Sequence, residues 1–196
     1  MKVLVIGDSH AYSGWPDINI PEVSFTVVHI GPRLMYSFGK GKWNLLSDYL
    51  PMDVVIFCFG EIDIRCHLFN YANTLEQIQQ KIDELVLNYM EAILVNVKNI
   101  KIKTCVHFVP PTVKKETVKE DPEYPFVGSD IARRIAVRYM NHRLKVSCKE
   151  NGFIFVNGQE CYEDEEGYLN PNMSDGSVHI KETLPLMDFI YGELLK

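Results

Sequence analysis

The chain has 196 residues, of which 46% are hydrophobic and 23% are charged, a composition ample for one buried core. Its formal net charge of −6 argues against a nucleic-acid-binding protein held by phosphate contacts, because such proteins need a basic surface. No apolar stretch approaches the ~18 residues that a membrane span needs, so membrane insertion is not expected.

Apolar strand patterns recur along the whole chain, and glycine, proline or polar residues end each of them. They cover residues 2–6, 24–30, 53–59, 101–109 and 153–156. The third run is apolar almost throughout, which is typical of a strand that helices cover on both faces.

Helical patterns alternate with these strands. They cover residues 34–50, 74–97, 130–150 and 181–195. The first is interrupted at Gly39-Lys40-Gly41, and Thr74 is expected to cap the second. Residues 112–127 are charged and contain two prolines, so we expect a surface loop or lid there.

Five strands separated by helices predict a parallel sheet in a three-layer α/β/α sandwich, built by residues 1–196 as one domain. Ligands of such sheets bind outside the carboxyl ends of the strands. Ser9, Gly31, Gly60 and Pro110 each follow one of the first four strands, so the polar and glycine-containing turns gather at one edge.

The five cysteines are odd in number and irregularly spaced. Two lie in strand patterns, where cysteine packs as a small hydrophobic residue, and the others share no zinc-type spacing. Reduced thiols and a cytoplasmic location are therefore expected. The apolar run before Gly7 is only four residues long, which favours a first strand over a signal peptide.

Both ends of the chain carry candidates for nucleophilic catalysis. The turn Gly7-Asp8-Ser9 presents a serine hydroxyl at the end of the first strand, and the N–H of Ser9 could serve an oxyanion. Asp175 and His179 precede the final helix and could supply an orienting carboxylate and a general base. A helix cap at Ser9 and a surface histidine beside a turn-forming aspartate are the alternatives.

The densest polar cluster directly follows the third strand. It comprises Gly60, Glu61, Asp63, Arg65 and His67. These residues predict a substrate pocket, or a buried ion-pair network that shapes one, and both interpretations can hold together. The spacing of the acidic residues and His67 fits no zinc or calcium pattern, so no metal is expected.

The segment after the second strand offers further candidates. Gly31 would let a backbone N–H approach an oxyanion closely, although a simple strand-to-helix turn is the alternative. Arg33, and His10 beside Ser9, are expected to line the site. Residues 39–42 lack the frame of a phosphate loop, and no dinucleotide-binding motif follows the first strand, so no cofactor is expected.

Four sequence blocks, in this order, resemble those of the SGNH (GDSL-type) hydrolases, esterases and lipases with a flavodoxin-like sandwich. The matching residues are Gly7-Asp8-Ser9, Gly31, Gly60-Glu61-Ile62-Asp63, and Asp175 with His179. The resemblance spans residues 2–180. It implies that Ser9 is the nucleophile, His179 the base and Asp175 its orienting carboxylate. It also implies an oxyanion site from the Ser9 and Gly31 N–H groups and an asparagine side chain of the third block.

Two positions depart from the family pattern. Ile62 stands where the family has its asparagine, and Asp175 precedes His179 by four residues where the family usually has three. Losing an oxyanion donor typically costs ~10²–10³ in rate. Arg65, His67 or Asn70 could replace it; otherwise the enzyme is slow or inactive.

The resemblance predicts a serine esterase that removes a short acyl group, most readily acetyl, from a carbohydrate through an acyl-enzyme. The Gly-Glu-Ile-Asp-x-Arg-x-His segment is similar to a subgroup found near polysaccharide-modifying proteins, which favours an acylated sugar or another small ester as substrate. A sugar O-acyltransferase using the same acyl-enzyme and a catalytically silent glycan-binding module are the alternatives. No oligomeric state is predicted.

Overall fold

The computed structural model describes residues 1–31, 33–41 and 44–196, and a five-stranded parallel sheet forms its centre. The strands are β1 (Lys2–Gly7), β2 (Ser24–His29), β3 (Val54–Cys58), β4 (Lys103–His107) and β5 (Ile154–Val156), in the order β2-β1-β3-β4-β5. Gly7, at the end of the central β1, lies opposite His29 of β2 and Cys58 of β3. The five predicted strands are confirmed.

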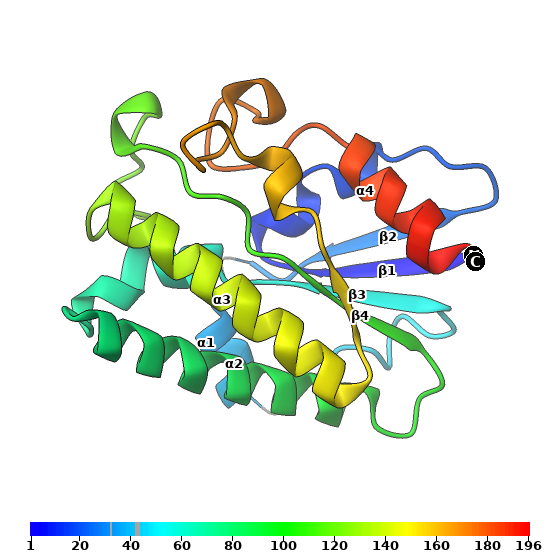
Figure 1. The fold of residues 1–196 in the computed structure, drawn as a ribbon. Helices are drawn as coiled ribbons and strands as arrows, with labels where there is room; N and C mark the ends of the chain where they lie inside the picture. Colours follow the sequence, from blue (N-terminus) through cyan, green and yellow to red (C-terminus); the bar gives the residue numbers. More distant parts are fainter. Residues whose placement is uncertain (32, 42–43) are drawn as a thin grey trace.

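Helices cover both faces of this sheet (Figure 1). One face carries α1 (Met35–Lys40), α2 (Leu75–Val97) and α3 (Asp130–Asn151), and the other carries α4 (Leu184–Phe189). Short helical turns lie at Ser9–Tyr12, Trp15–Asp17, Asp63–His67, Leu68–Asn70, Lys115–Thr117, Gln159–Tyr162, Pro171–Met173 and Ile190–Leu194. Each face of the sheet has its own apolar core, so the predicted three-layer α/β/α sandwich is confirmed.

Capping residues delimit the two long helices. Thr74 Oγ1 accepts from the Gln77 backbone N–H at 3.2 Å, and the Gln77 side chain accepts in return from the Thr74 N–H, which completes a capping box. Ser129 caps α3 with a single bond, accepting from the Ala132 N–H at 3.2 Å, and Gly152 follows α3 in the left-handed conformation. The predicted bounds of both helices therefore agree with the structure within one residue.

Two helix predictions need correction. The helix expected over residues 34–50 ends at Lys40, and residues 46–49 form a bend and a turn. Lys42 and Trp43, like Pro32, lie outside the described residues. The final helix begins at Leu184 instead of Lys181, with Pro185 in its first turn, and it passes into a π-helical turn over Ile190–Leu194. Proline favours a first helical turn because its missing N–H needs no partner there.

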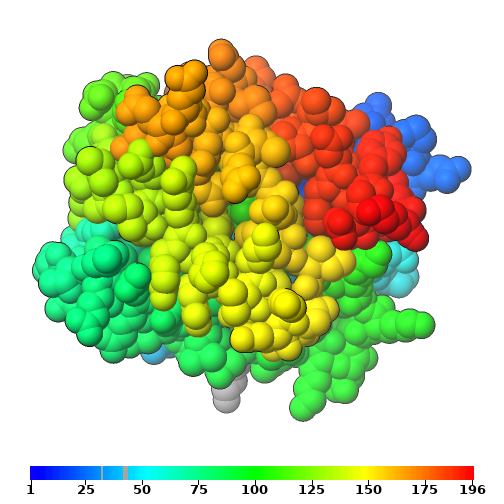
Figure 2. Space-filling view, in the orientation of Figure 1, coloured from blue at the N-terminus to red at the C-terminus, as the bar shows by residue number. Residues whose placement is uncertain are grey.

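The segment predicted as a loop or lid, residues 112–127, lies beside residues 160–175 at one end of the molecule (Figure 2). Leu169 donates its backbone N–H to the Thr112 carbonyl at 2.9 Å, and Lys114 pairs with Glu166 at 2.7 Å. All five cysteines are free thiols, and only Cys161 is exposed. Within the described ranges, none of the helices combines the length and the apolar character needed to cross a bilayer.

Candidate active site

Ser9, His179 and Asp175 form a continuous hydrogen-bonded series. Ser9 Oγ lies 3.0 Å from His179 Nε2, and His179 Nδ1 lies 3.2 Å from Asp175 Oδ2. An ionised carboxylate can only accept, so Nδ1 carries the proton and Nε2 accepts from the serine hydroxyl. The serine and the histidine are 170 positions apart in sequence, so the two ends of the chain meet here.

The position of Ser9 follows from the short turn after β1. Asp8 Oδ1 accepts from the His10 backbone N–H at 2.9 Å and so caps the helical turn that begins at Ser9. The first N–H groups of a helix have no partner within it, so the Ser9 N–H is one of the unpaired donors of this turn. The last residue pair between β1 and β2 is Gly7 with His29. Ser9 and Gly31 each lie two residues beyond this pair, and Gly31 has a φ of +79°. Only glycine adopts such a φ readily.

The loop that carries the histidine is closed on itself. The backbone N–H of Asp175 donates to the His179 carbonyl at 3.1 Å, and Asp175 Oδ1 accepts from the Ser177 N–H at 2.8 Å. Ser174 and Ile180 form an antiparallel bridge across the loop. The four-residue spacing between Asp175 and His179 therefore fits a compact loop in which the two side chains still meet.

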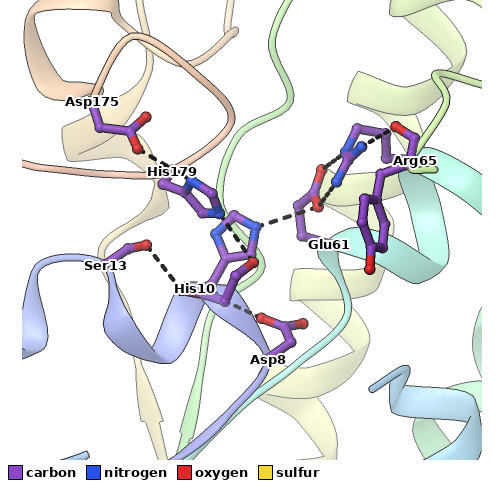
Figure 3. Close-up of polar contacts among 9 residues, drawn as sticks. Asp8, His10, Ser13, Glu61, Arg65, Asp175 and His179 are labelled. Atoms are coloured by element: carbon purple, nitrogen blue, oxygen red, sulfur yellow. Dashed lines mark hydrogen bonds and ion pairs between the residues drawn. The ribbon is translucent and has the colours of Figure 1, made fainter. Parts of the chain in front are cut away.

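A second set of polar groups lies beside His179, on the side away from Asp175 (Figure 3). The His10 ring packs against the His179 ring with centroids 4.7 Å apart, and His10 Nε2 lies 3.3 Å from Glu61 Oε2. Glu61 in turn accepts from Arg65 Nε and Nη2 at 2.6 and 3.1 Å. His10, Glu61 and Arg65 are all buried. Of the polar cluster predicted after the third strand, Glu61 and Arg65 form a buried ion pair, whereas Asp63 and His67 take no part in it.

Burial and neighbouring charges set the protonation of these groups. Burial, and after it the positive charge of His10, lower the pKa of His179. These effects outweigh the charge and hydrogen bond of Asp175, which raise it. Burial alone would raise the pKa of Glu61, but the hydrogen bond and charge of His10, with Arg65, lower it to about 2. Burial raises the pKa of Asp8 to about 6. His179 is therefore neutral at neutral pH, the form in which a general base accepts a proton.

A pocket of about 290 Å³ opens at Ser9 and His179. Its walls come from Ser9, His29, Ile62, Arg65, Lys119, Asp121, Tyr124, Phe126, Ser177, Val178 and His179. Four of these side chains belong to the segment predicted as a loop or lid. Their individual roles were missed because no periodicity or motif marks them; only the position of the segment after the fourth strand pointed to the site.

Arginine side chains hold this wall in place. Arg65 Nη1 donates to the Tyr124 carbonyl, and the Val127 N–H donates to the Arg65 carbonyl at 2.8 Å. The Phe126 ring contacts the guanidinium groups of Arg65 and Arg133, whose Cζ atoms lie 5.3 and 4.9 Å from its centroid. Cation–π contacts of this kind are attractive and strengthen when desolvated.

Of the seven residues predicted to bind substrate, only Arg65 lines the pocket at Ser9 in the described part of the chain. His10, Gly60 and Glu61 are buried outside its lining, and the other three have different positions. The Asp63 carboxylate is buried and accepts from the backbone N–H groups of Met35 and Tyr36. His67 lines a second pocket, between α2 and the start of α1. Arg33 Nε donates to the Ile30 carbonyl at 3.2 Å. Asp63 faces inward because the chain winds into a π-helical turn after Gly60, which turns neighbouring side chains in different directions.

Gly60 is needed for space and conformation. It has a φ of +120°, and a Cβ there would lie 2.8 Å from Met35 Cε and 2.9 Å from Val109 Cγ2. Gly60 therefore allows the chain to turn beneath the pocket, and it is a buried part of the frame.

The position at which the SGNH pattern has an asparagine is apolar in this chain. Ile62 is buried and lines the pocket beside Ser9. Of the three candidate replacements, His67 belongs to the second pocket and Asn70 Nδ2 donates to the Cys66 carbonyl at 3.1 Å. Arg65 reaches the pocket, with its guanidinium bonded to Glu61 and Tyr124. Among the described residues, no three His, Cys, Asp or Glu side chains converge as metal ligands.

Comparison with known proteins identifies the fold. No protein-family model matches the chain, and no curated protein matches its sequence. Solved structures match along nearly its whole length. A proposed acylhydrolase from Bacteroides fragilis NCTC 9343 superposes with a TM-score of 0.64 and 18% identity, covering 99% of this chain and 84% of that one.

Two further solved structures show the same architecture. A GDSL-like lipase from Bacteroides thetaiotaomicron VPI-5482 has a TM-score of 0.60 and 19% identity, over 99% of this chain and 85% of that one. An acetyl xylan esterase has a TM-score of 0.59 and 14% identity, over 98% of each chain. At these identities the likeness establishes a shared fold, and function has to be argued from the site.

Proposed function

We propose that this protein is an SGNH-type serine esterase that cleaves a short acyl ester, in the first place acetyl, from a carbohydrate. The observation that carries the proposal is the series Ser9 Oγ, His179 and Asp175, with separations of 3.0 and 3.2 Å. Nucleophile, base and orienting carboxylate within hydrogen-bond reach are the parts that acyl transfer needs. Neighbours of the same fold include a GDSL-like lipase and an acetyl xylan esterase, which supports ester hydrolysis.

In the proposed reaction, Ser9 Oγ attacks the ester carbonyl carbon while its proton passes to His179 Nε2. The oxyanion that forms accepts hydrogen bonds from the Ser9 and Gly31 N–H groups. The C–O bond to the sugar then breaks, and His179 returns the proton to the leaving sugar oxygen, which leaves an acyl-enzyme. Water, deprotonated by the same histidine, hydrolyses the acyl-enzyme and releases the acid and free Ser9.

The pocket favours a small, partly polar substrate. Its volume of about 290 Å³ is at the lower end for ligand sites, which suits a short acyl chain better than a long one. Ile62, Phe126 and Val178 offer apolar contacts, whereas Lys119, Asp121 and Ser177 bring polar groups to the same pocket. Sugar hydroxyls bond to such groups, and this mixture supports an acylated carbohydrate.

The test is active-site labelling of the purified protein with a fluorophosphonate ester, followed by peptide mass spectrometry. A stoichiometric adduct on Ser9 that is lost in His179→Ala is expected, because only an activated serine reacts. Ser13→Ala is the matched control, since Ser13 Oγ lies one helical turn away and bonds to the Ser9 carbonyl. A folded protein that gives no adduct on Ser9 contradicts the proposal. Release of acetate from acetylated xylan or a similar acetylated glycan then tests the substrate.

A further inference from the structure

His10 is a buried titratable group that the proposed reaction does not use. It is 2% exposed, and it does not line the pocket at Ser9. It lies between the Glu61 carboxylate and the His179 ring (Figure 3). A buried polar side chain costs free energy unless it is hydrogen-bonded or paired with a charge, so the charge state of His10 needs an explanation.

The groups that face His10 come from four parts of the chain. Asp8 comes from the end of β1, Glu61 and Arg65 from the turn after β3, His107 from β4, and His179 from the loop before α4. Burial lowers the pKa of His107 to about 3, so this residue adds no charge. The remaining buried set, Asp8, Glu61 and Arg65, has two carboxylates and one permanent cation. A protonated His10 makes this set neutral overall.

The 3.3 Å contact of His10 Nε2 with Glu61 agrees with a protonated His10, whereas His10 Nδ1 has no hydrogen-bond partner among the described residues. Burial alone would lower its pKa, but the hydrogen bond to Glu61 and the charge of Asp8 outweigh burial and raise the pKa of His10. Buried charges persist when they are paired and hydrogen-bonded, and Glu61 is already fixed by two bonds from Arg65. The cation at His10 is thus held by groups that are themselves held in place.

We propose that His10 is a positioning residue for His179: as a buried imidazolium paired with Glu61, it supports the His179 ring facing Ser9 and keeps that ring neutral. Ring packing at 4.7 Å restricts rotation of His179 away from Ser9 Oγ. The positive charge also separates His179 from the Glu61 carboxylate, which would otherwise stabilise a protonated His179. This inference rests on the proposed role of His179 as the general base.

The same charge would assist the later half of the reaction. After Ser9 gives up its proton, His179 and His10 are both cations, and their repulsion favours passing the proton on to the leaving sugar oxygen. The chain from His10 through Glu61 and Arg65 continues to the Tyr124 carbonyl in the pocket wall. The base and the wall that contacts the substrate are therefore held by one set of ion pairs.

The test is an NMR titration of the His179 ring C–H resonances, because this readout does not require activity. We compare the unaltered protein with His10→Gln, which retains a donor toward Glu61 without a charge, and His10→Phe, which retains a ring. We expect His179 to titrate at higher pH in both variants, and the acidic limb of kcat/KM to move in the same direction. His142→Gln, at an exposed position of α3, is the control and should leave His179 unchanged.

The outcomes separate this inference from the proposed function. An unchanged His179 titration in folded His10→Gln overturns the inference, whatever the activity. A raised titration in a protein that neither hydrolyses esters nor labels at Ser9 supports the coupling and contradicts the esterase. If both variants fail to fold, the ¹⁵N shifts of His10 in the unaltered protein decide: two protonated ring nitrogens at neutral pH support the inference, and a neutral ring overturns it.

Discussion

The carboxylate of Asp63 accepts a hydrogen bond from the backbone N–H of Met35 at 2.7 Å, so the turn after β3 is tied to the start of α1. A second bond, from the Tyr36 N–H at 3.0 Å, uses the other carboxylate oxygen. α1 begins four residues after Gly31, so the same contact holds the segment that carries a proposed oxyanion donor. Asp63 thus acts on the site through the backbone, without contact to the substrate pocket.

Replacing Asp63 by alanine should lower both stability and activity. Burial raises the pKa of Asp63 to about 7, so the carboxyl group is only partly ionised at neutral pH. A hydrogen bond between uncharged groups contributes about 0.5–1.5 kcal/mol, and the substitution leaves two backbone donors without their acceptor. We expect a loss of roughly 1–3 kcal/mol in the free energy of unfolding, measured by urea denaturation, and a lower kcat/KM in the folded fraction. Asp188→Ala, at an exposed position of α4, is the control. Equal stability of the two variants would show that the contact contributes nothing.

Placing an asparagine at position 62, as the SGNH pattern has it, should raise activity if the protein is an esterase. Ile62 lines the pocket beside Ser9, and an amide there could donate to the oxyanion. Because such a donor is worth ~10²–10³ in rate, we expect Ile62→Asn to hydrolyse a short-chain ester at least about tenfold faster. Ile62→Leu keeps the pocket apolar and should not gain. Absence of hydrolysis in both variants and the parent would favour a glycan-binding module.

His179 and Asp175 should differ in their importance for activity. Removing the base by His179→Ala should cost roughly 10²–10⁴ in kcat/KM, the usual range for general base catalysis. The side chain of Asp175 is 42% exposed and its bond to His179 is 3.2 Å long. Water can solvate His179 in its place, so Asp175→Ala should cost only about tenfold. Steady-state kinetics on one chromogenic ester compares them, and equal losses would mean that the carboxylate is indispensable.

The pH dependence of hydrolysis should reflect the environment of His179. Burial and the charge of His10 lower the pKa of His179, so the neutral base persists to pH values below the ordinary histidine pKa of about 6.5. We expect kcat/KM to stay on its plateau through that pH and to fall only in more acidic solution. A pH–rate profile checks this, and an acidic limb above the ordinary value would contradict the proposed environment.

Asp8 should make stability fall as the pH rises. Burial raises its pKa from 3.8 to about 6, so the folded protein binds this proton more tightly than the unfolded chain does. Its contribution is fully present below pH 3.8 and is lost as the pH rises through about 6. The loss is on the order of 3 kcal/mol. Asp8→Asn cannot ionise, so it should gain stability relative to the parent across this window, as urea denaturation at several pH values would show.

Strand and helix patterns allowed the fold to be predicted because the sheet is buried on both faces. Residues 54–58 are apolar at every position, and the caps at Thr74 and Ser129 lie close to the predicted helix starts. The bounds of α1 and α4 could not be predicted so well. Their short helices have few periodic positions, and tertiary contacts such as the Asp63 cap decide where they begin.

The residues of the candidate site could be predicted where a local motif marks them. The direction in which a side chain points could not be predicted. Ser9, Asp175 and His179 follow turn signals, and the structure brings them within hydrogen-bond reach. Glu61 and Arg65 are one helical turn apart and pair with each other, whereas Asp63 between them faces α1. A list of polar residues does not reveal such directions, because they depend on the π-helical turn in which these residues lie.

The contact between Ser9 and His179 joins residues 170 positions apart, and the strands β2 to β5 lie between them in the sequence. A chain emerging from the ribosome would thus expose its serine long before the histidine is synthesised. Ser9 would remain an ordinary alcohol during that time, because its proposed base has not yet been synthesised. Reactivity at Ser9 would then report the completion of folding, and a fluorophosphonate pulse on stalled chains of increasing length could time that event.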